Sequence, residues 1–433
     1  MQRMKEIAEM ILAEGKKLGA DVVTCSVSES EKKEFNVDGG RFSLMRTLFD
    51  RGVNIVILKD GRKGTTSINR FDEESVREAI KQCMAACDSA QPDPAWEYCS
   101  EARQERYVQG EPVCNTEKLF ERTRELLETI KADYPKIIME QMITSHDCAK
   151  AVYMNSYGVK MESVAGAYSF SLMYSAHEGE KGTSFYGSDV TLANLDQPVI
   201  ETAFIRRELE AVQNQLDPKP LEGKFTGTVL LAPLALLEIV LGTVLSNFVS
   251  DSSLIDGTSI WKDKLNEKVA DERLNVSFTP YADHVVIGQR YTGEGYKAED
   301  FDLIRDGRLV SFNLSQYGAN KTGFKRASCS CWNLSVKPGS KTLDELIGGI
   351  ERGVLVMRFS GGEPSAAGEF SGVAKNSFLI ENGKITCALT ETMISGCVPD
   401  MLSSIRDISS DTLQDGTLNV PYVAFDGVTI SGS

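Results

Sequence analysis

A single carboxylate, Glu238, lies in an apolar stretch that runs from Ala232 to Ser246. A carboxylate on such a helix can act as a general base when it stands beside a metal-bound water. Hydrolytic zinc is held chiefly by histidine or cysteine, and this stretch contains neither. No histidine occurs between His177 and His284 either. The sequence therefore predicts that Glu238 is a structural residue, satisfied by a neighbouring hydrogen-bond donor.

The histidines offer weaker candidates for chemistry. His177-Glu178 begins like a zinc-peptidase motif, but Lys181 stands where the second imidazole would be. A loop histidine is therefore expected there. His146 and His284 are isolated in the sequence, and we expect them to be hydrogen-bonded residues of strands or loops.

Ten cysteines are spread along the chain without a repeating frame, which is typical of reduced cytoplasmic thiols. Cys329 and Cys331 are separated by one residue, which is the wrong spacing for a Cys-x-x-Cys zinc or redox site. We therefore expect partly buried thiols there, and no disulfides.

Hydrophobic periodicity and turn residues predict an α+β protein of several units. The expected division is an N-terminal α+β unit at 1–87, a polar connector at 88–115, a central α+β unit at 116–217 and a sheet-rich domain at 218–433. The N-terminal and central units are each predicted to contain both strands and helices.

Local signals place several of these elements. Asp72 is the expected N-cap of a helix that starts at about Glu73. Short strands are expected at 22–28 and 52–59. Asp306-Gly307 and Asn382-Gly383 lie between β-forming residues and predict tight hairpin turns.

The formal charge of −15 comes from scattered acidic residues, and no basic tract could neutralise phosphates. Nucleic acid and anionic membranes are therefore not expected as partners. The longest apolar run, 228–249, is interrupted by polar residues and falls short of a membrane span. The N-terminus lacks the apolar core of a signal peptide, so a cytoplasmic location is expected.

The C-terminal half resembles the TldD/PmbA family, metallopeptidase-related proteins that have also been described as modulators of DNA gyrase. The segments that carry the resemblance occur in the family's order: Ile304–Ser311, Ser315–Ala319, Gly353–Val356, Ser360–Glu363, Phe370–Gly372, Phe378–Ile385 and Glu391–Gly396. Asn155–Gly158 and Asp60–Gly64 resemble the family's N-terminal half. The resemblance thus covers nearly the whole chain and implies the same α+β fold.

In the family's catalytic members, a helix carries His-Glu-x-x-x-His and a cysteine near the C-terminus completes a zinc site. Carried over by position, Leu237 and Gly242 replace the two histidines, and Glu238 stands at the glutamate. No cysteine follows Cys397. The resemblance therefore implies that this chain holds no zinc and that Glu238 is vestigial. Zinc is expected in a partner subunit.

Gly361 and Gly362 correspond to a family segment beside the substrate cleft. Backbone without side chains could pair there with an extended peptide by strand addition. A bulge or turn after a strand would explain these two glycines equally well.

Three functional hypotheses follow. The first is a non-catalytic subunit of the PmbA/TldE type that pairs with a TldD-like zinc peptidase to degrade or process unfolded peptides. The second is a homodimer that binds peptides without cutting them. The third is an independent metal-dependent peptidase that uses carboxylates such as Glu238, Asp251 and Asp256.

Overall fold

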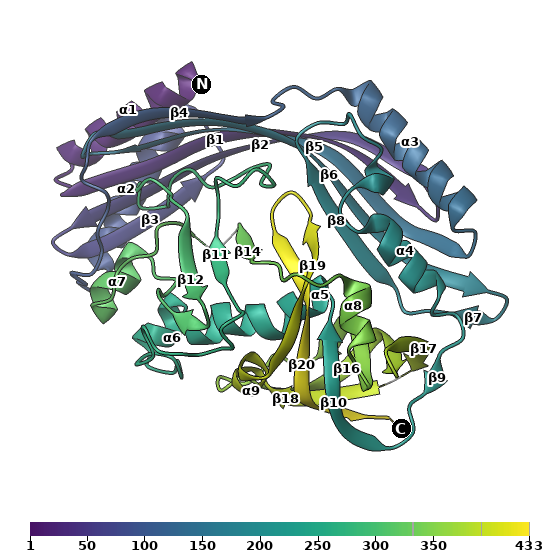
Figure 1. Ribbon diagram of the computed structural model, residues 1–433. Coiled ribbons are helices and arrows are strands. Elements are labelled where there is room, and N and C mark those ends of the chain that lie inside the picture. The colour runs from purple at the N-terminus through teal and green to yellow at the C-terminus, as the bar shows by residue number, and fades with distance from the viewer. Residues whose placement is uncertain (331–332, 391, 433) are drawn as a thin grey trace.

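The computed structural model describes residues 1–330, 333–390 and 392–432. A long curved sheet from the N-terminal half arches over a second, C-terminal sheet (Figure 1). Both halves of the chain contain helices as well as strands, and strands predominate over helices in the C-terminal half. The predicted α+β class with a sheet-rich C-terminal domain is therefore confirmed.

The N-terminal sheet has the order β3-β2-β1-β5-β6-β4, with β7 and β8 also paired to β6. Strand β1 pairs antiparallel with β5 from Thr24 opposite Asn155 to Asp38 opposite Gln141. The segments 1–87 and 116–217 therefore contribute strands to one continuous sheet, and the connector 88–115 supplies β4 to it. The strands are β1 Val22–Asp38, β2 Arg41–Lys59, β3 Arg62–Ile68, β4 Arg103–Gly110, β5 Ile137–Asn155, β6 Val159–Glu178, β7 Lys181–Gly182 and β8 Tyr186–Leu192.

Strands β1 and β2 extend well beyond the short segments 22–28 and 52–59 that alternation predicts. The charged run that follows Ser28 stays in the sheet because its side chains find partners across the strands. The buried Glu34, for example, receives two bonds from Arg46, with Nη2 and Oε1 2.8 Å apart and Nε and Oε1 2.9 Å apart. The charged residues interrupt the apolar alternation, and for this reason the predicted strands are too short.

The helix predicted from about Glu73 is confirmed as α2, and the helices of the C-terminal domain are shorter. Asp72 caps α2 as expected, and its carboxylate accepts a bond from Ser75 N–H at 2.9 Å. The helices are α1 Gln2–Lys17, α2 Glu73–Ser89, α3 Thr116–Asp133, α4 Ile205–Gln213, α5 Pro233–Leu236, α6 Asp251–Ile255, α7 Gln316–Thr322, α8 Leu343–Gly348 and α9 Val398–Ser403, with a 3₁₀ turn at Val199–Glu201. Two wider π-helical turns, Leu237–Leu241 and Val244–Phe248, continue α5.

The C-terminal sheet has the order β13-β12-β11-β14-β20-β10-β15-β16-β17-β9, and β19 pairs with β20. Because β18 pairs with both β16 and β20, the strands β20, β10, β15, β16 and β18 form a closed circuit. The strands are β9 Lys219–Pro220, β10 Lys224–Leu231, β11 Val276–Phe278, β12 Phe301–Arg305, β13 Arg308–Leu309, β14 Leu334–Val336, β15 Arg352–Gly361, β16 Glu369–Glu381, β17 Lys384–Thr390, β18 Thr392–Cys397, β19 Ile405–Gln414 and β20 Asn419–Ser431.

Both predicted hairpin turns are confirmed. Asp306 and Gly307 have φ values of 47° and 69°, and Asn382 and Gly383 have values of 50° and 75°. Two consecutive positive φ angles are those of the tight turn that suits the twist of a hairpin. Within the described residues, no helix is long and apolar enough to cross a membrane.

Candidate functional site

The helix that carries Glu238 follows directly from the buried strand β10. Pro233 occupies its first turn, where a missing N–H costs nothing. The next turns are π-helical, a widening that often occurs at functional positions. Glu238 therefore lies on a π-helical turn of a helix that directly follows a buried strand.

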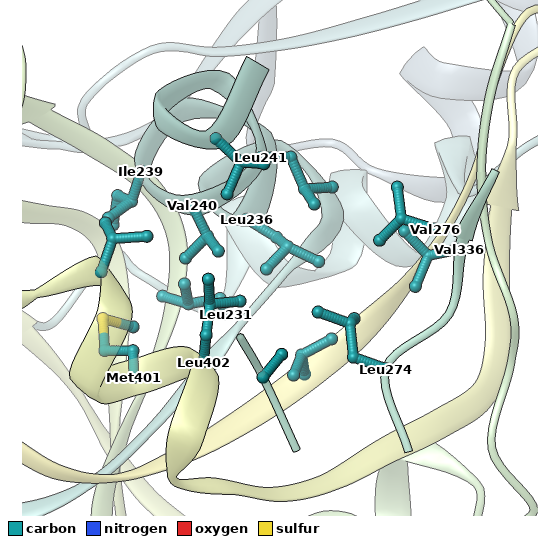
Figure 2. Packing of buried hydrophobic residues seen from close by; sticks show 14 of the residues in the cluster. Leu231, Leu236, Ile239, Val240, Leu241, Leu274, Val276, Val336, Met401 and Leu402 are labelled. Carbon is teal, nitrogen blue, oxygen red and sulfur yellow. The ribbon is translucent and has the colours of Figure 1, made fainter. Parts of the chain in front are cut away.

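The side chains around Glu238 point into the core of the C-terminal domain. Leu236, Ile239, Val240 and Leu241 are buried and pack against residues of β10, β11, β14 and α9 (Figure 2). These contacts fix the position of the helix, and apolar side chains cover most of its surface. Glu238 itself is on the exposed side.

The carboxylate of Glu238 accepts a hydrogen bond from the backbone N–H of Phe359 at 2.7 Å. Strand β10 pairs with β15 only as far as Leu231 opposite Val356. Past that point no strand of the described residues pairs with this edge of β15, and the Glu238 carboxylate accepts the N–H that a neighbouring strand would otherwise bond. Partial desolvation raises the pKa of Glu238, while the Phe359 N–H and the charge of Arg358 oppose that rise. The expected structural partner for Glu238 is therefore a backbone amide.

Zinc does not fit the positions that would correspond to the family's ligands. Leu237 is partly buried against the core, and a Cβ at Gly242 would lie 2.8 Å from the carbonyl oxygen of Leu237. A histidine could not occupy position 242 unless the helix shifted. In the part of the chain that the structure describes, no three His, Cys, Asp or Glu residues converge as metal ligands would.

Asp251, one of the carboxylates of the third hypothesis, is engaged locally. Asp251 accepts bonds from the N–H of Ser315 at 2.9 Å and from its Oγ at 2.5 Å, which ties α6 to the start of α7. Asp256 is the C-terminal cap residue of α6. Asp251 thus holds two helices together.

Gly361 ends strand β15 opposite Gly372 of β16. The ring of Phe359 covers both glycines, since a Cβ at Gly361 would lie 2.6 Å from its Cζ and a Cβ at Gly372 would lie 2.4 Å from it. The two glycines therefore make room for an aromatic ring. Gly362 lies in open space.

The same strand leaves an open backbone edge. Successive N–H groups of a strand point in alternate directions, so the Gly361 N–H faces the same edge as the Phe359 N–H that reaches Glu238. No other strand of the described residues pairs with this edge beyond Val356. Glu238 and Gly361 are thus brought to one edge of the sheet. The Phe359 N–H that joins them bonds a residue 121 positions away in the sequence.

The segment after Gly362 is tied to the same helix. Asn247 Nδ2 donates to the carbonyl of Ser365 at 3.1 Å, with the carbonyl of Pro364 at 3.4 Å. Gly368 packs against the ring of Phe248, where an added Cβ would lie 2.9 Å from Cζ. Helix and glycine segment therefore form one unit. Sequence reasoning missed Phe359 and Asn247, because no local pattern marks a contact across more than a hundred residues.

The remaining candidates lie elsewhere. His177 is near the end of β6 before a short hairpin, and its Nε2 is 3.0 Å from Ser175 Oγ. His146 in β5 has its Nε2 2.7 Å from the carbonyl of Glu111. Cys329 is buried, and desolvation raises the pKa of its thiol to about 12. Cys331 lies outside the described residues.

Two family models match the chain over most of its length. The model described as PmbA/TldA metallopeptidase C-terminal domain matches residues 223–432, and that described as PmbA/TldA metallopeptidase domain 1 matches residues 24–87. The chain belongs to the PmbA/TldD family. The helix of Glu238, the open edge of β15 and the glycine segment all lie in the C-terminal domain of this family.

Individual members of the PmbA/TldD family show the same relationship. An uncharacterized protein of Methanocaldococcus jannaschii is 24% identical over 98% of this chain and 99% of its own. A zinc metalloprotease TldD homolog of Saccharolobus solfataricus is 31% identical over 34% of this chain and 36% of its own. The crystal structure of TldE from Thermococcus kodakarensis superposes with a TM-score of 0.84 at 21% identity, covering 98% of this chain and 100% of that one.

Removing the Glu238 carboxylate should loosen the edge of β15. We expect Glu238→Ala to lower the free energy of unfolding by about 1 kcal/mol, because the Phe359 N–H loses a charged acceptor. Glu238→Gln keeps an acceptor oxygen and should lose less. Urea denaturation measures the difference, and amide hydrogen exchange at Phe359 should be faster in the alanine variant alone. Equal exchange in both variants would contradict this role.

Proposed function

We propose that this chain is the non-catalytic, PmbA/TldE-like subunit of a peptidase, and that it pairs with a zinc-bearing TldD-like member of the family to degrade or process unfolded peptides. The observation that carries the proposal is the misfit of zinc at Leu237 and Gly242 in an otherwise well-packed family domain. The family's C-terminal domain is present, while Leu237 packs against the core and Gly242 has no side chain that could bind a metal. Zinc and the hydrolytic step would then belong to the partner.

The geometry around Glu238 supports a positional role for this chain. A general base needs a carboxylate that is available to a metal-bound water. Glu238 instead bonds the backbone of β15 and stabilises the edge at which Gly361 exposes its own N–H. An extended peptide could add to that edge through main-chain hydrogen bonds, largely without regard to its sequence. Such a mode suits unfolded peptides.

The proposed place of action is the cytoplasm. The nine cysteines that the structure describes are all free thiols, and most are buried. Proteins of oxidising compartments usually pair theirs.

The decisive experiment compares proteolysis by three samples: this chain, the zinc-bearing relative from the same cells, and the two mixed. We expect hydrolysis of an unfolded peptide to rise at least about tenfold on mixing, which is ~1.4 kcal/mol of added transition-state stabilisation. Activity of the mixture equal to that of the relative alone would contradict the subunit role. Gly361→Val should reduce the gain, because its side chain displaces the Phe359 ring at the open edge. Gly362→Ala is the matched control, since its Cβ meets nothing within 4 Å.

The open edge at Gly361 also favours a second candidate, a homodimer that binds peptides without cutting them. In that case the chain alone would bind a fluorescent unfolded peptide, Gly361→Val would weaken the binding, and mixing with the zinc-bearing relative would change no activity.

A further inference from the structure

An open cavity of about 810 Å³ lies between helix α4 and the elements α8, β16 and β17 of the C-terminal domain (Figure 1). Neither Glu238 nor Gly361 lines it. Sites for small ligands are typically cavities of about 300–1,000 Å³ with a mostly apolar lining and a few polar groups. The floor of this cavity consists of buried apolar residues: Ile347, Leu355, Met357, Phe378, Ala388 and Tyr422. Its size and lining therefore match those of a ligand site.

Arg207 of α4 supplies a hydrogen-bond donor to this cavity. Its Nη2 donates to Oδ1 of Asp411 at 2.9 Å, and Oδ2 of Asp411 accepts the N–H of Leu343 at 2.8 Å. The guanidinium carbon also lies 5.9 Å from the centroid of the Tyr422 ring, which belongs to the floor. Nη1 of Arg207 is buried and has no hydrogen-bond partner among the described residues. Because a buried donor without an acceptor is unfavourable, a ligand oxygen beside Nη1 would be stabilised.

The acidic residues around the cavity determine which charge it accepts. Glu210 and Asp344 line it, both are exposed, and neither forms an ion pair within the described residues. Arg207 is the one basic residue among the described residues that line the cavity, and Asp411 already balances its charge. The two remaining carboxylates therefore attract an ammonium group and repel an anion.

We propose that this cavity binds the amino terminus of an extended peptide whose first residue is apolar. The side chain of that residue packs on the floor, its carbonyl oxygen accepts a hydrogen bond from Nη1 of Arg207, and its ammonium group faces Glu210 and Asp344. The rest of the peptide leaves past Ile385, a lining residue that is 44% exposed. In taking a peptide as the ligand, this assignment rests on the proposed function, and it adds the feature of the peptide that the chain recognises.

The test is methyl NMR of the purified full chain with isotope-labelled methionine methyl groups. Met357 lies on the floor, and its signal is assigned with Met357→Leu. Three probes share the leucine side chain and differ in charge: leucinamide, N-acetyl-leucinamide and N-acetyl-leucine. At pH 7, where an α-amino group is mostly protonated, leucinamide should shift the Met357 signal with a Kd on the order of 1 mM. N-acetyl-leucinamide should bind about threefold more weakly, and N-acetyl-leucine at least about tenfold more weakly.

Two further probes test the side chain and the source of the amine. Glycinamide has no side chain for the floor and should bind at least about tenfold more weakly than leucinamide. The amide of Leu-Gly-Gly should bind as tightly as leucinamide, because the proposed pose lets the chain continue out of the cavity.

A double variant tests the charges. Glu210→Gln combined with Asp344→Asn should bind leucinamide and N-acetyl-leucinamide with affinities equal within about twofold. Both residues are exposed, so the variant should fold, and unchanged signals of the other methionines check that it does. Glu121→Gln is the matched control, since Glu121 is an exposed glutamate of α3 that does not line the cavity. Its affinity for leucinamide should equal that of the natural chain.

Four outcomes would overturn the assignment: no shift of the Met357 signal with leucinamide, equal binding of the three leucine probes, a charge preference that the double variant keeps, or binding of leucinamide without binding of the Leu-Gly-Gly amide. The last would identify a site for a free amine. None of these measurements needs a partner chain. If the probes bound as expected but mixing with the zinc-bearing relative raised no proteolysis, the subunit role would be wrong and this site would stand. If no probe bound and mixing did raise proteolysis, only this site would be wrong.

Discussion

Replacing Gly318 with alanine is expected to lower the free energy of unfolding by about 3 kcal/mol. A Cβ at this position of α7 would lie 1.9 Å from Oδ1 of Asp251 and 2.6 Å from its Cγ. The carboxylate cannot move away freely, because it accepts the N–H and Oγ of Ser315. Either those two bonds break or α6 and α7 separate.

The measurement is urea denaturation of Gly318→Ala beside Gly348→Ala. Gly348 ends α8, and a Cβ there would meet nothing within 4 Å, so the control should change stability by about 0.5 kcal/mol or less. Asp251→Ala removes the clashing group, so the double variant should be less destabilised than the sum of the two single variants. Additive losses would show that the clash with Asp251 is not the cause. The outcome bears on function, because it tests whether Asp251 holds helices rather than a metal.

Replacing Glu208 with glutamine is expected to stabilise the protein at pH 8 and to have little effect at pH 4. Glu208 is buried on α4, where it accepts bonds from Ser188 Oγ at 2.5 Å and Tyr186 OH at 3.4 Å. Burial raises the pKa of its carboxyl from 4.5 to about 7. The bonds from Ser188 and Tyr186 oppose that rise, and the nearby charge of Asp189 adds to it. The folded chain therefore holds this proton more tightly than the unfolded chain does.

The sign of the pH dependence follows from that difference. Below about pH 4.5 Glu208 is protonated in both states and carries no penalty. As the pH rises to about 7 the unfolded state releases its proton first, so this residue's contribution to stability falls. Above the folded-state pKa the full penalty applies, on the order of 3 kcal/mol. Glutamine cannot ionise and should escape it.

Urea denaturation at a series of pH values checks this. The stability of Glu208→Gln minus that of the natural chain should grow from about pH 4.5 to about 7 and then stay level. A difference that is the same at every pH would mean that Glu208 does not titrate between these values. Glu34 offers a control, because this other buried carboxylate is paired with Arg46, and Glu34→Gln should not be stabilising at pH 8.

The features that the sequence predicts correctly are local ones. The Asp72 cap of α2, the Asp306-Gly307 turn and the Asn382-Gly383 turn each depend on residues within a few positions of one another. Family motifs spread over the chain predict the α+β class, and that class is confirmed. The absence of histidine near Glu238 could be read directly from residue types.

The sequence by itself thus determined the helix capped by Asp72, the two hairpin turns and the family. Only the tertiary structure decided what Glu238 bonds and which edge Gly361 exposes. It also decided that the segments 1–87 and 116–217 share one sheet. The physical reason is that caps and turns satisfy backbone groups within a few residues, whereas strand edges are paired or open according to which distant strands arrive beside them. No short pattern in the sequence encodes that arrival.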